Sequence, residues 1–199
     1  SDTSASIIQC LLQEASTYQV QIRMKSEVIQ ITHQANKFSI ILKQGEQIES
    51  DFLFIATGGY AKASQYDWLR TLPHTLVPPV PSLFTFQLPL SGLRALMGVS
   101  VSMVRLKLEG SHWMERGPLL LTHWGLSGPA VLKLSAWAAR ELHDKGYDFI
   151  VRINWLDEGE QELRTRWQGI RDKMGNQKLY SRNPFLLPQR LWIYLLEEE

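Results

Sequence analysis

Residues 122–131 read THWGLSGPAV and join a strand-like apolar run to a helical pattern. Proline fits the first turn of a helix, and the apolar residues after it recur at helical spacing. The pattern therefore predicts a helix over 129–145, which Gly146 ends as its C′ residue. Ser127 is the expected N-cap, because a serine hydroxyl accepts a hydrogen bond from the free backbone N–H groups of a first turn.

His123 and Trp124 have no role in a capped helix start. The pattern [ST]-H-W-x-x-x-G-P-x-x-L occurs at 111–121 and again at 122–132. Two copies of an eleven-residue unit are too few for a solenoid. We interpret them as a paired β-turn framework or a chance similarity, with a duplicated binding element as the alternative. A helix N-terminus also offers free N–H groups and positive potential, which would favour a flavin or an anionic substrate.

The rest of the chain alternates between short helical and strand patterns, so the expected fold class is α+β. Apolar spacing predicts a helix over residues 3–16. Residues 48–56 run into paired glycines as FLFIATGG, which is typical of a strand buried on both faces. Three prolines within residues 78–81 predict a stiff, extended crossing. We therefore expect two regions, 1–78 and 79–199, of which the second is first β-rich and then helical.

Composition excludes several classes of protein. The 199 residues are 44% hydrophobic and 21% charged, with a formal net charge of +1. That near-neutral charge gives no electrostatic argument for a nucleic-acid or membrane partner. No apolar run approaches the roughly 18 residues that span a bilayer, and no signal-peptide pattern is visible. The single cysteine, Cys10, fits a reducing compartment, so the expected location is the cytoplasm.

Both ends of the sequence predict that it is a segment of a longer protein. It opens SDTSAS without a methionine and closes with an amphipathic pattern followed by three glutamates. Acidic side chains at a helix C-terminus oppose the macrodipole, which favours a helix that continues. The sequence leaves the oligomeric state open.

Two catalytic alternatives have weak support. A serine hydrolase would use Ser127, but Gly-Leu-Ser-Gly is followed by Pro129, so the G-x-S-x-G elbow lacks its last glycine. A zinc site would need His112 and His123 to converge across a hairpin, and the five histidines show no H-x-x-x-H spacing. We therefore expect no metal. The sequence also contains no G-x-G-x-x-G and no P-loop, and ATGG at 56–59 is short.

Four stretches taken together resemble one bacterial flavoprotein family: DFLFIATGGYAKAS, HTLVPPVPSLFTFQLP, GPLLLTHWGLSGPAVLKLS and NPFLLPQRL. The family consists of NAD(FAD)-utilising dehydrogenases, aminoacetone-oxidase-like or BaiN-type FAD-dependent oxidoreductases. THWGLSGPAVL is the most specific stretch, and the resemblance covers essentially the whole chain. It implies that residues 1–78 are an incomplete FAD-binding segment of glutathione-reductase type. Residues 79–199 are then an inserted β-barrel-like domain with a helical part, which covers the reactive side of the flavin.

The resemblance also implies site residues, position by position. His123 and Ser127 are the candidate catalytic residues, in the loop that faces flavin or substrate. One departure is that family members commonly follow ATGG with a segment containing TGDG, which this sequence lacks. The implied cofactor-binding residues are Val28, Ala56, Thr57, Gly58, Gly59, Gly125, Ser127 and Gly128.

The implied function is hydride transfer between FAD and a nicotinamide, as NAD(P)H, or a small organic substrate. In such an enzyme the flavin carries the chemistry, and the protein supplies orientation and electrostatics. Because the glycine-rich pyrophosphate turn is absent from this sequence, we expect the chain alone to be inactive and to bind FAD weakly or not at all. The alternative is a β-rich interaction module without catalysis.

Overall fold

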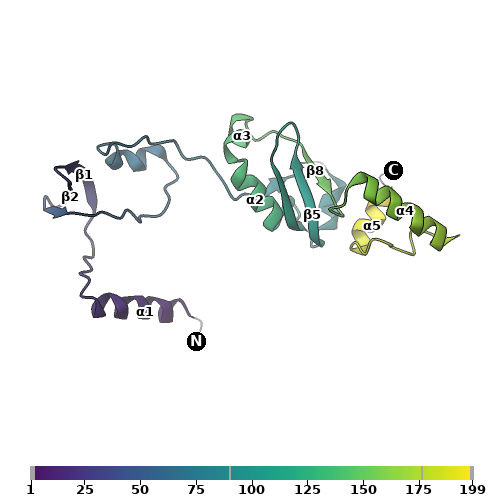
Figure 1. Ribbon diagram of the computed structural model, residues 1–199, viewed down its shortest axis with the longest axis horizontal. Helices are drawn as coiled ribbons and strands as arrows, with labels where there is room; N and C mark the ends of the chain where they lie inside the picture. The colour runs from purple at the N-terminus through teal and green to yellow at the C-terminus, as the bar shows by residue number, and fades with distance from the viewer. Residues whose placement is uncertain (1–2, 90, 176, 198–199) are drawn as a thin grey trace. The chain divides into compact units, whose positions relative to one another are not determined.

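The computed structural model describes residues 3–89, 91–175 and 177–197 (Figure 1). The chain divides into two compact units, Ser1–Pro79 and Val80–Glu199, at the proline-rich crossing. Helices accompany a three-stranded sheet in the first unit and a curled five-stranded sheet in the second, which confirms the α+β class. The assignment of the first unit to an FAD-binding domain stays a prediction.

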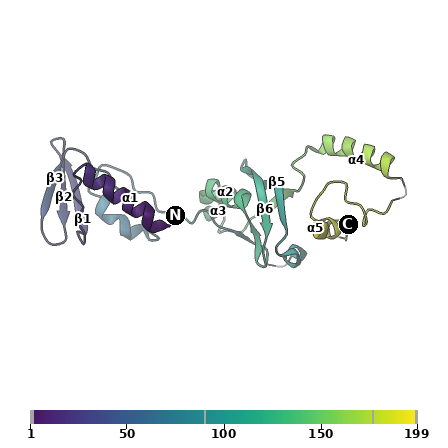
Figure 2. The same cartoon turned by 90° about the horizontal axis from the view of Figure 1, so that it is seen from below.

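The first unit combines one long helix with a small antiparallel sheet (Figure 2). Its helix begins after Thr3, whose hydroxyl accepts from the Ser6 N–H at 3.4 Å, so Thr3 is the N-cap. The three strands pair in chain order, and a turn with two positive-φ residues, Ala35 and Asn36, joins the first two. The elements are α1 (Ser4–Thr17), β1 (Val28–Gln34), β2 (Lys37–Leu42), β3 (Gln47–Ser50) and the 3₁₀ helix η1 (Ala63–Leu69).

The buried strand predicted over residues 48–56 is wrong beyond Ser50. Phe52 and Phe54 are 84% and 93% exposed, and residues 51–59 belong to no strand. A strand that is apolar on both faces needs sheet neighbours and a covering layer on each side. The described part of the first unit provides neither, and α1 likewise buries none of its residues. The first unit therefore leaves a large apolar surface uncovered.

The second unit is built on a curled antiparallel sheet with strand order β4–β7–β6–β5–β8 (Figure 1). The strands are β4 (Phe86–Gln87), β5 (Ser100–Leu108), β6 (Met114–Leu121), β7 (Gly125–Ser127) and β8 (Val151–Asn154). The helices are η2 (Gly92–Leu96, 3₁₀), α2 (Pro129–Trp137), α3 (Ala139–Asp144), α4 (Glu160–Met174) and α5 (Gln189–Glu197). Burial alternates along β5 and β6, as expected for strands with one face on a core.

The core of the second unit lies between the sheet and α2. Val104, Leu106 and Leu119 point into it from the strands and are fully buried. The helix predicted over 129–145 begins and ends as expected but is broken at Ala138, where φ is −86° and ψ is 6°. Leu134 and Leu142, on either side of the break, are both fully buried. The second unit therefore has a buried hydrophobic core of its own, whereas the first unit leaves much of its apolar surface exposed.

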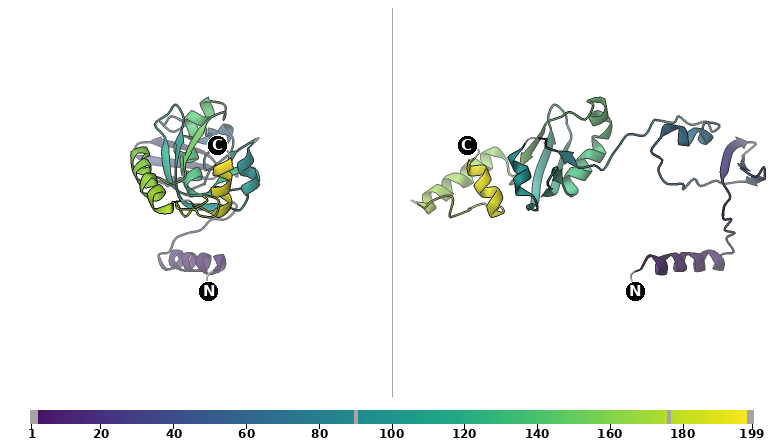
Figure 3. Two further views of the ribbon diagram at one scale, coloured as in Figure 1. Left: turned by 90° about the vertical axis from the view of Figure 1, so that its right-hand side faces the viewer. Right: turned by 180° about the vertical axis from the view of Figure 1, so that it is seen from behind.

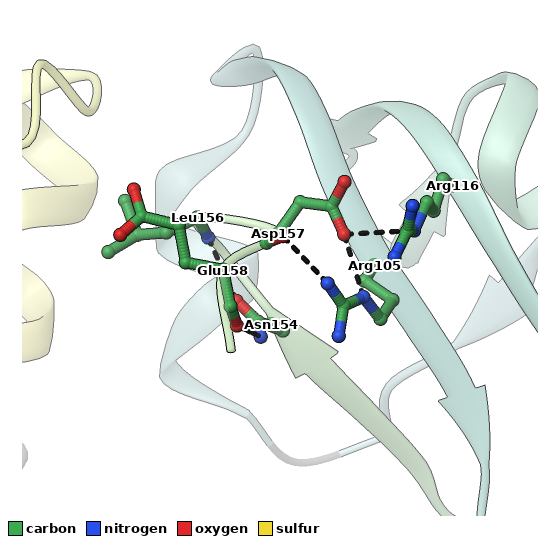
Figure 4. A network of polar contacts seen from close by, with 6 residues as sticks. All are labelled: Arg105, Arg116, Asn154, Leu156, Asp157 and Glu158. Atoms are coloured by element: carbon green, nitrogen blue, oxygen red, sulfur yellow. Dashed lines mark hydrogen bonds and ion pairs between the residues drawn. The ribbon is translucent and has the colours of Figure 1, made fainter. Parts of the chain in front are cut away.

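An aspartate attaches the helical end of the second unit to its sheet (Figure 4). Asp157 lies between two arginines, and its Oδ1 accepts from Arg105 Nε at 2.7 Å and lies 3.1 Å from Arg116 Nε. Arg105 Nη2 also donates to the Asp157 carbonyl at 2.7 Å. The Asn154 side chain closes the same turn, because it accepts from the Leu156 N–H and donates to the Glu158 carbonyl. The network fixes where α4 begins.

Beyond this network, α4 and α5 form the end of the second unit (Figure 3). Trp167 of α4 stacks on Phe185, with ring centroids 5.6 Å apart and an interplanar angle of 19°. The Trp192 indole of α5 is buried and donates to the Leu179 carbonyl at 2.8 Å. Among the described helices, none combines the length and the apolar character that crossing a bilayer requires.

Candidate functional site

The tandem [ST]-H-W pattern forms two turns, one at each end of β6. In the first turn, Ser111 Oγ accepts from the Trp113 N–H at 3.1 Å. In the second, Thr122 Oγ1 accepts from the Gly125 N–H at 3.1 Å and donates to the Gly125 carbonyl at 3.0 Å. The hydroxyl at the same place in each copy thus holds a hairpin turn together. The repeat is a paired β-turn framework.

The position of these turns excludes the zinc alternative. His112 and His123 lie beyond opposite ends of β6, whose eight residues extend about 26 Å at the usual strand rise. Two zinc ligands lie within about 2 Å of the same ion, so this pair cannot converge. Within the described part of the chain, no three His, Cys, Asp or Glu side chains gather to hold a metal.

The two turns differ in their exposure. Trp113 is half-buried and packs against the core of the second unit. Trp124 is 42% exposed, and the neighbouring His123 is also exposed. Their rings contact each other edge to face, with centroids 4.2 Å apart. Only the second turn therefore exposes both its histidine and its tryptophan ring to a ligand. We call residues 122–124 the hairpin tip.

The backbone of the hairpin tip is held from two directions. The Leu88 N–H donates to the Trp124 carbonyl at 2.9 Å. Arg94 Nε donates to the His123 carbonyl at 2.7 Å, and Arg94 Nη1 donates to the Pro89 carbonyl at 3.0 Å. Sequence reasoning missed Arg94, because a single arginine in a short 3₁₀ helix has no local pattern that indicates a distant partner.

Two glycines that were expected to bind the cofactor have structural roles. Gly125 has a φ of +154°, and a Cβ there would lie 2.1 Å from the Phe86 carbonyl oxygen. Gly128 has a φ of +101°, and a Cβ there would lie 2.8 Å from the Pro118 carbonyl oxygen. Both positions exclude a side chain because the neighbouring backbone is too close. Their conformations thus follow from the packing of the sheet, whatever they also bind.

Ser127 does not have the predicted capping role. It belongs to β7, where it pairs with Leu120, and the N-cap of α2 is Gly128 without a side-chain hydrogen bond. Among the described residues, no hydrogen bond joins Ser127 to His123 or to another base. The hydrolase alternative therefore has no nucleophile–base contact to support it.

A cavity of about 610 Å³ lies beside β7, lined from both edge strands of the sheet. Leu126 of β7, Gln87 of β4 and Ile153 of β8 contribute to its wall. Its lining also includes four aromatic rings, which contact each other edge to face at centroid distances of 5.0–6.0 Å. They are Phe84, Phe86, Tyr147 and Phe149. Such a wall suits a planar, apolar-faced ring with a polar edge.

The first unit gathers some of the other predicted cofactor residues. Val28, Ala56 and Thr57 line one cavity of about 560 Å³. Gly58 and Gly59 follow at its margin but do not line it. Among the described residues, the backbone groups of residues 53–59 have no hydrogen-bond partner, so their N–H and C=O groups are available to a ligand. These residues fit one edge of a dinucleotide site.

A curled antiparallel sheet with a helical extension defines an α+β domain of barrel-and-helix type. Residues 80–199 match the HI0933-like protein barrel and H2TH domain. The chain therefore belongs to the HI0933-like family, a family of FAD-dependent oxidoreductases. This confirms the broad family that the sequence resembles.

Three curated relatives are similar over much of the chain. The ribosomal RNA dihydrouridine synthase of Escherichia coli K12 is 33% identical over 96% of the chain. The 3-dehydro-bile acid delta(4,6)-reductase of Clostridium scindens is 28% identical over 87% of the chain. The ribosomal RNA dihydrouridine synthase of Haemophilus influenzae is 32% identical over 65%. The chain spans 47%, 44% and 34% of the lengths of these relatives, which is less than half of each.

Proposed function

We propose that the chain belongs to an FAD-dependent reductase that saturates the ring double bond of a uridine in RNA. In this proposal the chain contains the substrate-side domain of the enzyme and one edge of its cofactor domain. The observation that carries the proposal is the exposed His123–Trp124 tip, held by Arg94 in a unit whose aromatic cavity adjoins β7. The expectation that the chain alone binds FAD weakly and is inactive remains part of the proposal.

The names of the three relatives share one kind of chemistry. Making dihydrouridine and reducing a delta(4,6) system both add hydrogen across a carbon–carbon double bond. In uridine this bond is conjugated to a carbonyl, so its far carbon accepts a hydride and its near carbon a proton. The chemistry that a bound flavin supplies is transfer of the hydride.

The residues of the second unit have three tasks in this proposal. The aromatic wall formed by Phe86 and Phe149 holds a planar ring by stacking and edge contacts. Trp124 offers a second, exposed ring face. The His123 imidazole is the candidate proton donor, since histidine is the most frequent general acid or base in enzymes. Arg94 positions His123 through its carbonyl.

RNA is preferred to a small molecule because the two relatives with identities above 30% act on ribosomal RNA by name. The expectation that no nucleic acid binds was based only on the net charge of the whole chain, and it stays untested. The present proposal departs from that expectation. A small organic substrate, reduced with NAD(P)H as electron donor, is the second candidate. The bile-acid reductase and the aromatic wall of the cavity favour it.

The test uses the parent protein that the sequence predicts, loaded with FAD and supplied with NADPH. It is expected to convert uridine to dihydrouridine in unmodified ribosomal RNA, measured by mass spectrometry of the nucleosides. His123→Ala is expected to lower the rate about 100-fold or more, because a general acid usually contributes that much.

His112→Ala is the matched control, since His112 occupies the same place in the other turn and lies far from the hairpin tip. It is expected to retain the rate of the unchanged protein. If RNA stays unmodified while a steroid enone is reduced, the small-molecule candidate replaces the RNA substrate. Equal losses in the two histidine variants would remove His123 from the chemistry.

A further inference from the structure

Positive charge is concentrated in one part of the chain, although the net charge of the whole chain is close to zero. Residues 163–190, which we call the basic segment, contain seven Lys or Arg side chains against one acidic side chain, Asp172. Their net charge is therefore +6, whereas the whole chain has +1, so the remaining residues together have −5. All seven cations are exposed. The basic segment covers most of α4, the connection after it and the start of α5.

Helical spacing arranges four of these cations in two rows. Arg164 and Arg171 are seven residues apart and share one side of α4, while Arg166 and Lys173 share another side. Between the rows runs the apolar stripe of the helix, which is half-buried or buried. The stripe consists of Leu163, Trp167, Ile170 and Met174.

Several cations of the basic segment remain available to an anion. Arg171, Lys173 and Lys178 form no ion pair with any residue that the structure describes. Arg164 pairs with Glu160 at 2.8 Å, but both side chains are more than 70% exposed. Such a pair contributes little and exchanges readily for a stronger anion. Arg166, by contrast, pairs with the half-buried Glu158 and is held by it.

The basic segment also presents an aromatic ring among its charges. Tyr180 is 52% exposed and lies two residues from Lys178 and two from Arg182. An exposed ring beside cations is the combination that single-stranded RNA uses, because bases stack on the ring while the phosphates meet the charges. A membrane surface would instead need an exposed apolar helix face. The apolar stripe of α4 is occupied, since Trp167 stacks on Phe185.

Contacts within the second unit hold the start of the basic segment in place. The Asp157 network fixes the start of α4 to β5 and β6 (Figure 4). Arg166 lies over the Phe185 ring, 5.0 Å from its centroid. A surface that is already ordered loses less conformational entropy on binding.

We infer that the basic segment is the surface that binds the phosphate backbone of the RNA substrate; this inference rests on the proposed function. Phosphate contacts position a nucleic acid and give salt-dependent affinity, whereas the aromatic cavity and the hairpin tip would select the base.

The test measures binding of the 199-residue chain to a short fluorescein-labelled RNA hairpin by fluorescence anisotropy at several KCl concentrations. The variant reverses the three unpaired cations as Arg171→Glu, Lys173→Glu and Lys178→Glu. The control reverses three exposed cations elsewhere as Lys37→Glu, Lys107→Glu and Lys133→Glu, which changes the net charge equally. Circular dichroism confirms that both variants fold.

The variant is expected to lower the affinity at least about tenfold and to reduce the slope of log affinity against log salt by about 2–3, while the control changes neither. Equal losses in variant and control would overturn the inference, because they would show a general charge effect. Absence of RNA binding by the unchanged chain would overturn it too, and so would variant-sensitive binding to phosphatidylserine vesicles alone.

The RNA reduction assay of the parent protein separates the two proposals. If dihydrouridine forms and the charge reversals in the basic segment do not weaken RNA binding, the proposed function is supported and the docking surface is refuted. If RNA binds through the basic segment but no uridine is reduced, the docking surface is supported and the proposed function is refuted.

Discussion

The two turns at the ends of β6 share a local sequence pattern, and a hydroxyl holds each of them, yet they differ in their hydrogen bonds and in their surroundings. In the first, Trp113 is packed against the core of the second unit. In the second, Trp124 and His123 face solvent, and Arg94 and Leu88 hold their carbonyls. A sequence pattern that occurs twice can therefore form a turn in both places and still expose different side chains. Exposure, which the pattern does not encode, decides which copy is a candidate site.

The glycines of the two G-P steps should separate the turns most strongly. Gly128→Ala is expected to lower the free energy of unfolding by about 3 kcal/mol or more, because its φ is strained and its Cβ would meet the Pro118 carbonyl. Gly117→Ala is expected to cost only about 1–2 kcal/mol, because its nearest neighbour would be 3.8 Å away and only φ is unfavourable. Urea unfolding followed by circular dichroism measures both. Equal losses of unfolding free energy in the two variants would mean that the backbone near Pro118 can shift to accept the new methyl group without destabilising the fold.

The two tryptophans come next in expected size. Trp113→Ala should lower the free energy of unfolding by about 2–3 kcal/mol, since it removes a ring that packs on the core. Trp124→Ala should cost less, about 1 kcal/mol, because 42% of the residue is already exposed to solvent. The same urea titrations report the difference. A large cost at Trp124 would show that the hairpin tip is a structural element, and it would weaken the proposed site.

The hydroxyls should show the smallest effect and no difference between the turns. Ser111→Ala and Thr122→Val each remove hydrogen bonds within a turn, so each should cost about 1 kcal/mol. Thermal unfolding of the two variants side by side is sufficient to compare them. A much greater loss at Thr122 would mean that the second turn depends on its hydroxyl in a way that the first does not.

Local patterns predicted the elements that depend on local energetics. The helix start at Pro129 and its end before Gly146 follow from proline and glycine positions and from apolar spacing. These features hold because each is stabilised mainly by residues a few positions away.

Features that depend on distant partners were not predictable. The apolar run around Phe54 has the pattern of a buried strand, but the described part of the first unit has no layer to cover it. The anchoring of His123 by Arg94 joins residues 29 positions apart. Ser127 became a strand residue because β7 pairs with β6, which a capping pattern cannot indicate. The whole-chain net charge is limited for a related reason, since a sum over the chain cannot show that cations gather in one helical segment.

One arginine of the basic segment connects it to the hairpin tip. Arg190 donates to the carbonyls of Ala95, at 2.6 Å, and Met97, at 3.4 Å, and so holds the end of η2, the helix from which Arg94 reaches the tip. A guanidinium has five N–H donors, so Arg190 can bind a phosphate while it keeps both carbonyls. If the basic segment binds the phosphates as inferred, a phosphate that orders Arg190 would also order the support of the tip, and the two sites would be thermodynamically linked. Because linkage is reciprocal, a base bound at the tip would then raise the affinity for the phosphates by the same factor by which the phosphates raise the affinity for the base.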